Sequence, residues 1–103
     1  MTIREHFEVW REVSRHKLEV CKGLIQECAN GEKSLDSLQA PFNRALNARK
    51  YRMAENYLST MEQAFSEIRY KLCSYEQAPK CEALTKWLAE ARKELENAKS
   101  GYL

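Results

Sequence analysis

Apolar residues recur along the chain at spacings of three and four, which is the period of an amphipathic α-helix. This spacing predicts three helices, over about residues 3–29, 38–75 and 79–100. A connector over residues 31–40 separates the first two. The second ends before Pro79, because the residue that precedes a proline disfavours helical backbone. The pattern therefore predicts an all-α fold.

The first predicted helix has a clear start, a clear end and a broad apolar stripe. Thr2 and Glu5 fit a capping box, in which the hydroxyl and the carboxylate each accept a hydrogen bond from a free backbone N–H. Gly31 suits the left-handed conformation that closes a helix. The stripe covers roughly half of the helix circumference. It consists of Ile3, Phe7, Val9, Trp10, Val13, Leu18, Val20, Cys21, Leu24, Ile25, Cys28 and Ala29.

The other two predicted helices carry narrower stripes. Heptad spacing runs from Tyr51 to Tyr75 in the second and from Cys81 to Tyr102 in the third. Short connectors make neighbouring helices antiparallel. We therefore expect one domain over residues 1–103, a three-helix antiparallel up-down-up bundle that resembles a coiled coil. Its long central helix would hold Pro41 in its first turn, and part of it would overhang the bundle.

The broad stripe of the first helix has two interpretations. In a three-helix core each helix touches two others and needs a wide apolar arc. Alternatively, apolar surface that the bundle leaves uncovered marks an interface with a partner. Lys17 and Lys50 fall inside apolar arcs, and we expect their long stems to pass along apolar neighbours towards water rather than to face an acid across an interface.

Composition narrows the class of protein. The chain has 103 residues, a formal net charge of +2, three glycines and two prolines. Few turn-forming residues argue against an all-β fold, and the small charge does not demand a polyanionic partner. No apolar run approaches the ~20 residues of a membrane span, and Glu5 and Glu8 interrupt the start of the chain. These features predict a soluble, cytoplasmic protein with no membrane partner.

The four cysteines and two histidines do not form a metal-binding pattern. Cys21 and Cys28 lie on one predicted helix about 10 Å apart along its axis, too far for a disulfide. Cys73 and Cys81 flank a predicted turn and could meet, but we expect all four cysteines to be free thiols. Their spacings miss those of zinc sites, and His6 and His16 point in different directions. The sequence predicts no metal and no cofactor.

Catalytic motifs are equally scarce. The chain has no G-x-S-x-G, no H-E-x-x-H and no glycine-rich phosphate loop. Neither histidine follows a glutamate at the spacing of di-iron bundles. We expect no catalytic residue and no enzymatic activity.

A basic segment is the most suggestive polar feature. It contains Arg44, Arg49, Lys50 and Arg52 with no acid between Phe42 and Ala54. Such residues can contact phosphates, but these arginines point in different directions around a helix. We expect solvation or internal pairing with carboxylates at the neighbouring helix ends, and an acidic protein or a nucleic acid stays open as a partner. Those carboxylates are Glu27, Glu32, Glu90, Glu94 and Glu96.

By elimination, the sequence predicts a non-enzymatic protein-interaction module. It would be a small helical adaptor, chaperone or inhibitor that binds and regulates a larger protein, as some small proteins of mobile elements bind host enzymes. One alternative is a helical nucleic-acid-binding protein that uses the segment Arg44–Arg52, and another is a structural homo-oligomer. The candidate contact residues are Trp10, Arg44, Arg49, Lys50, Arg52, Tyr70 and Trp87.

Overall fold

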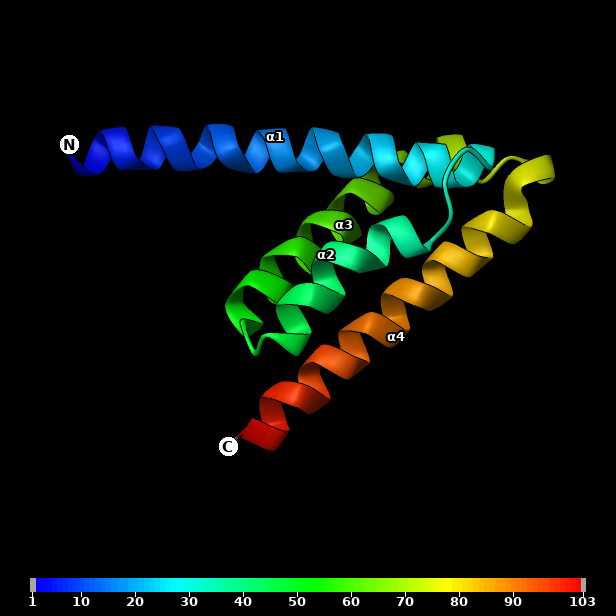
Figure 1. Cartoon of the computed structure of the whole chain (residues 1–103). Coiled ribbons are helices and arrows are strands. Elements are labelled where there is room, and N and C mark those ends of the chain that lie inside the picture. Colours follow the sequence, from blue (N-terminus) through cyan, green and yellow to red (C-terminus); the bar gives the residue numbers. More distant parts are fainter. Residues whose placement is uncertain (1, 103) are drawn as a thin grey trace.

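The computed structural model describes residues 2–102, without the side chains of residues 14 and 102. Within this range the chain forms helices and no strand, which confirms the all-α prediction. Four helices pack together instead of three (Figure 1). They are α1 (Ile3–Asn30), α2 (Asp36–Asn47), α3 (Tyr51–Leu72) and α4 (Ala78–Tyr102), with a short 3₁₀ helix over Tyr75–Gln77.

The prediction of one long central helix is wrong, because the chain reverses between α2 and α3. Arg49 has a left-handed backbone (φ 59°), and its N–H donates to the carbonyl of Leu46. The Lys50 N–H donates to the carbonyl of Ala45 at 2.9 Å, which completes a Schellman motif. A left-handed arginine costs about 1–2 kcal/mol. The reversal allows α2 to bury its own stripe, which includes Leu38 and Phe42, and this gain outweighs that cost.

Both ends of α1 agree with the sequence, whereas both ends of the predicted second helix differ. Helix α3 ends at Leu72 and not near Tyr75. The Thr2–Glu5 capping box is present, with both hydrogen bonds at 3.3 Å. Gly31 closes α1 with φ 84°. The second helix begins earlier than expected, at Asp36, so Pro41 lies inside it rather than in its first turn. A proline there removes one helical hydrogen bond.

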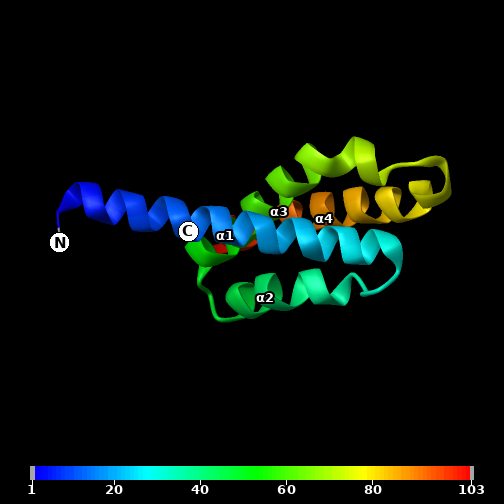
Figure 2. The ribbon, with the colours of Figure 1, turned by 90° about the horizontal axis from the view of Figure 1, so that it is seen from above.

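Helix α3 lies at the centre of the molecule and packs against each of the other three helices. Consecutive helices alternate in direction, and α1 crosses the others at an angle (Figures 1 and 2). Only the C-terminal half of α1 lies over the other helices, and its N-terminal half projects beyond them (Figures 1 and 2). The predicted overhang of the central helix is therefore wrong, because that helix is broken into α2 and α3, and it is the first helix that projects.

A disulfide joins Cys73 to Cys81, which corrects the expectation of four free thiols. The short connector between α3 and α4 brings the two Cα atoms to 5.5 Å, within the range that a disulfide requires. Cys21 and Cys28 are free and buried. Burial raises the pKa of both thiols, so neither is a reactive thiolate at neutral pH.

An ion-pair network also holds α4 against α3. Arg92 of α4 pairs with Glu55 and Glu62 of α3, and its guanidinium also donates to the Ser59 hydroxyl at 3.2 Å. The Lys99 ammonium lies 3.5 Å from Glu55. Hydrogen bonding to Glu62 is the largest cause of the raised pKa of Arg92. The disulfide therefore joins α3 and α4 at one end of the pair, and ion pairs join them towards the other end.

Candidate protein-interaction surface

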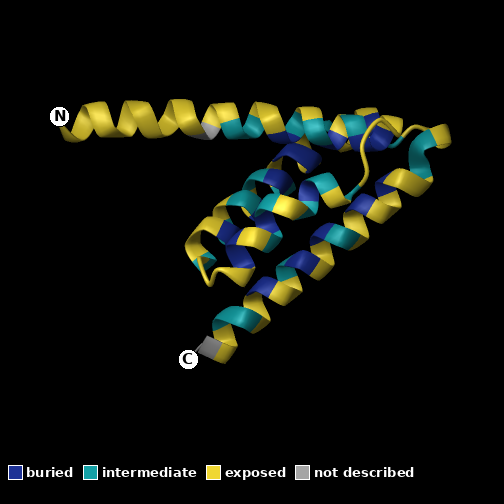
Figure 3. Cartoon of the chain, viewed as in Figure 1, coloured by how far each residue is buried: buried dark blue, intermediate teal, exposed yellow. Residues whose placement is uncertain are grey.

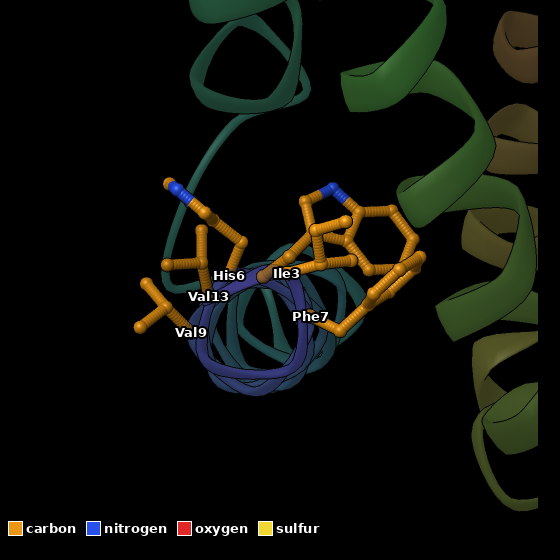
Figure 4. A pocket seen from close by; sticks show the side chains of 6 residues that line it. Ile3, His6, Phe7, Val9 and Val13 are labelled. Carbon is orange, nitrogen blue, oxygen red and sulfur yellow. The ribbon is translucent and has the colours of Figure 1, made fainter. Parts of the chain in front are cut away.

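The N-terminal half of α1 carries a set of largely exposed apolar side chains (Figure 3). At its inner end, Trp10 and Val13 also line a pocket with residues of α3. Ile3 is 77% exposed, Phe7 60% and Trp10 65%. Figure 4 shows Ile3 and Phe7 on the side of α1 nearer to α3, with Val9 and Val13 on the other flank. We call this surface the overhang face; it consists of Ile3, His6, Phe7, Val9, Trp10 and Val13.

The overhang face continues the stripe that α1 buries in the core. Eighteen residues make five full turns of an α-helix, so residues separated by eighteen point in the same direction. Ile3, Phe7 and Trp10 each precede a buried core residue by this interval. Those core residues are Cys21, Ile25 and Cys28. The overhang face is therefore the continuation of the buried apolar stripe of α1, and its residues are not isolated exposed apolar side chains.

Two lysines of α1 make polar contacts with α3. Its ammonium lies 5.6 Å from the centroid of the Tyr57 ring, a cation–π contact between α1 and α3. One turn later, Lys22 forms an ion pair with Glu67 of α3 at 2.6 Å, and this hydrogen bond raises the pKa of Lys22. The half-buried Lys17 thus places its ammonium over an aromatic ring of α3.

Charges on the overhang are balanced. Three arginines and three glutamates are exposed and interspersed along the helix, and Arg4 lies 3.9 Å from Glu8. A surface of this kind does not select a partner of one sign. The charged residues are Arg4, Glu5, Glu8, Arg11, Glu12 and Arg15.

The candidate contact residues of the sequence lie in separate places. Trp10 is on the overhang face. Tyr70 is 76% exposed in the last turns of α3, whereas the half-buried Trp87 packs edge-to-face against Phe42 at 6.3 Å and so belongs to the core. Of the apolar residues of the overhang face, the sequence predicts only Trp10 as a contact residue and misses Ile3, Phe7, Val9 and Val13. The breadth of the apolar stripe on the first predicted helix is the feature that could have identified them.

The four basic candidates lie at the turn between α2 and α3. Arg44, Arg49, Lys50 and Arg52 are all exposed, and we call them the basic corner. Across residues 2–102, no ion pair includes any of them, so the expected internal pairing is absent there. Two of the expected partners pair elsewhere: Glu27 with Lys33, and Glu96 with Arg92 and Lys99.

The described residues hold neither a metal-binding cluster nor a membrane span. They contain no group of three or more histidine, cysteine or acidic side chains placed to hold a metal ion. Each helix there is too short or too polar to serve as a membrane span. Within the described residues, the overhang face and the basic corner are therefore the two surfaces considered below.

No family model, no curated protein and no solved structure matches the chain.

Proposed function

We propose that this protein is a non-enzymatic protein-interaction module that docks through the overhang face onto an apolar surface of another protein chain. It acts as an adaptor, chaperone or inhibitor, by occupying that surface. The observation that carries the proposal is the exposure of a core-type helical stripe at Ile3, Phe7 and Trp10.

The chemistry of the face supports a protein partner. Aromatic side chains contribute the most to interface energies, because each buries a large rigid area at a small entropic cost. Phe7 and Trp10 are one turn apart and both are more than half exposed. An amphipathic helix that presents such anchors at intervals of three and four residues is a common way to occupy a groove or to pair with another helix.

A photo-crosslinking amino acid at Trp10 tests the proposal in the cells that express the protein. We expect a defined covalent adduct to one protein species, at a yield far above that of the same amino acid at Tyr70. Tyr70 is the matched control, because it is an aromatic residue of similar exposure outside the overhang face. Equal, diffuse labelling from both positions contradicts the proposal.

A second candidate function is nucleic-acid binding by the basic corner, and the absence of ion pairs there favours it. A mobility shift at two salt concentrations decides this candidate. Binding should weaken steeply with salt, and Arg49→Ala should reduce the salt slope by about one. Lys71→Ala, at the far end of α3, is the control that leaves the slope unchanged. No shift at low salt excludes this function.

A further inference from the structure

We propose that the overhang face and the basic corner bind one partner segment together, and that this segment is an acidic amphipathic helix of another protein. This inference rests on the proposed function and names the chemistry of its partner. The partner helix lies between the overhang of α1 and the N-terminal part of α3, which diverge from one another (Figure 1). Its apolar side packs on α1, and its carboxylates face lysine and arginine side chains.

A hollow between α1 and α3 continues the overhang face towards the core. Its volume is about 360 Å³, and Trp10 and Val13 of the overhang face line it together with Leu18. Helix α3 contributes only uncharged polar side chains to its lining. They are Asn56, Ser59, Thr60 and Gln63. A partner helix that packs on Trp10 therefore also reaches hydrogen-bonding groups of α3.

A second hollow lies beside the first, between α2 and α3. Its volume is about 300 Å³, and its lining includes Arg44 and Lys50 of the basic corner and the exposed Met53. The two hollows meet where α1 contacts α3: Lys17 lines the first, and its ammonium lies 5.6 Å from the ring of Tyr57, which lines the second. The overhang face and the basic corner are therefore parts of one surface.

Charge complementarity identifies the chemistry of the partner. The overhang as a whole carries balanced charges, but the two hollows do not: among the described residues, four cations and no carboxylate line them. These cations are Arg15, Lys17, Arg44 and Lys50. Within residues 2–102 none of the four forms an ion pair. The partner therefore has to supply the carboxylates.

The carboxylates of α3 are engaged elsewhere. Its three glutamates pair with cations outside this surface, Glu67 with Lys22 and both Glu55 and Glu62 with Arg92. They do not neutralise the cations of the hollows.

The apolar part of the surface favours a peptide over a nucleic acid. Phosphates can pair with the four cations, but they leave Val13 and Met53, which are 45% and 44% exposed, without an apolar neighbour. An amphipathic helix covers such side chains with its own apolar stripe, and glutamates that flank this stripe reach the cations. One acidic helix therefore complements both parts of the surface.

Selection from a random peptide library tests this chemistry without knowledge of the natural partner. The immobilised full chain is the bait, and the probe is a phage-displayed library of peptides of about 16 residues, enough for four helical turns. We expect the enriched peptides to carry apolar residues at intervals of three and four and more acidic than basic residues. Enrichment of neutral or basic peptides, or no enrichment above the empty support, overturns the inference.

Variants of the chain then locate the bound peptide. Fluorescence polarisation with the most enriched peptide should show a dissociation constant raised about thirtyfold by Trp10→Ala and about fivefold by Lys50→Glu. Tyr70→Ala and Lys71→Glu, at the far end of α3, are the matched controls that leave it unchanged. Circular dichroism checks that all variants keep their helix content. An affinity that Trp10→Ala and Lys50→Glu leave unchanged overturns the inference, as does tighter binding of a labelled single-stranded DNA of mixed sequence.

Failure of this inference is distinguishable from failure of the proposed function. The photo-crosslinker at Trp10 identifies the captured protein and, by mass spectrometry of the adduct, the segment that is attached. A defined protein attached through an acidic amphipathic segment supports both proposals. A defined protein attached through a neutral or basic segment overturns this inference and leaves the proposed function supported.

Discussion

The two halves of α1 have the same pattern and opposite environments. In the C-terminal half, the side chain of Ile25 is 1% exposed and packs into the core. In the N-terminal half, Phe7 points in the same direction five turns earlier, and its side chain is 60% exposed. Both halves lie on one continuous helix, so the difference does not come from secondary structure. It comes from how far the other helices reach along α1.

The same apolar stripe therefore has two different roles in the two halves of α1. Where α3 covers it, the stripe stabilises the fold, and where nothing covers it, the same stripe is available to another chain. Substitutions that act on one half alone can therefore test the comparison, since they should change stability in one half and association in the other.

The largest expected contrast lies between Ile25→Ala and Phe7→Ala. Ile25→Ala should reduce the free energy of unfolding by about 3 kcal/mol, since it leaves a cavity in the core. Phe7→Ala removes a larger side chain but should change that free energy by less than about 0.5 kcal/mol at a concentration where the chain is monomeric. Urea denaturation measures both. A similar loss from both substitutions would show that the overhang is covered within the monomer.

Reduction of the disulfide should give the next largest effect. The Cys73–Cys81 bridge closes a loop with a sequence separation of 8. Its loss should lower the free energy of unfolding by about 2.5 kcal/mol, because the unfolded chain gains freedom. The variant Cys73→Ser/Cys81→Ser should match the reduced chain. An unchanged free energy of unfolding in both cases would contradict this prediction.

Arg92→Met should cost about 1–2 kcal/mol near neutral pH, because it leaves Glu55 and Glu62 without their shared cation. Burial alone would raise the pKa of Glu55, but Arg92 and Lys99 outweigh it and hold that pKa below its usual value. A lowered pKa in the folded state means that this stability is present above the unfolded pKa and is lost as pH falls through the folded one.

The difference between Arg92→Met and the parent chain should therefore shrink as the solution becomes acidic. Unfolding curves measured from neutral pH to below the ordinary pKa of glutamate check this. A difference that stays constant over that range would mean that Arg92 acts by packing and not by charge. Arg4→Met, in the exposed Arg4–Glu8 pair of the overhang, is the control with no expected change.

The smallest contrast lies between the two caps of α1. Gly31→Ala should lower the free energy of unfolding by about 1 kcal/mol, since alanine disfavours the φ of 84° at this position. Thr2→Ala removes the opposite cap but should leave global stability unchanged. It should instead speed hydrogen exchange of the first turns of α1, and mass spectrometry of deuterated peptides measures this. Global destabilisation by Thr2→Ala would contradict an uncovered overhang.

Much of the local structure could be read from the sequence. The Thr2–Glu5 capping box and the Gly31 terminus depend on neighbouring residues only, and both are confirmed. The break between α2 and α3 could not be read, because Arg49 is not a typical left-handed residue and its conformation is imposed by the packing of Leu38 and Phe42. The Cys73–Cys81 bridge depended on the geometry of the connector, which the spacing alone left open.

The candidate surface was only half visible in the sequence. Trp10 was named as a contact residue, and the broad stripe indicated either a wide core arc or an interface. Tyr70 and Trp87 were named for their residue type, and the structure places one on the surface of α3 and the other against Phe42. A residue type shows what a side chain can contribute to a contact, but not whether the fold already uses it.

The sequence by itself determined that this protein is helical, where α1 begins and ends, and which side of α1 is apolar, because these depend on residues within a few turns of one another. The tertiary structure alone decided which part of that apolar side is covered. The reversal at Arg49 shortens the central helix, so α3 reaches only the C-terminal half of α1 and leaves Phe7 and Trp10 in solvent. The length and crossing of distant helices set that boundary, and no local pattern encodes them.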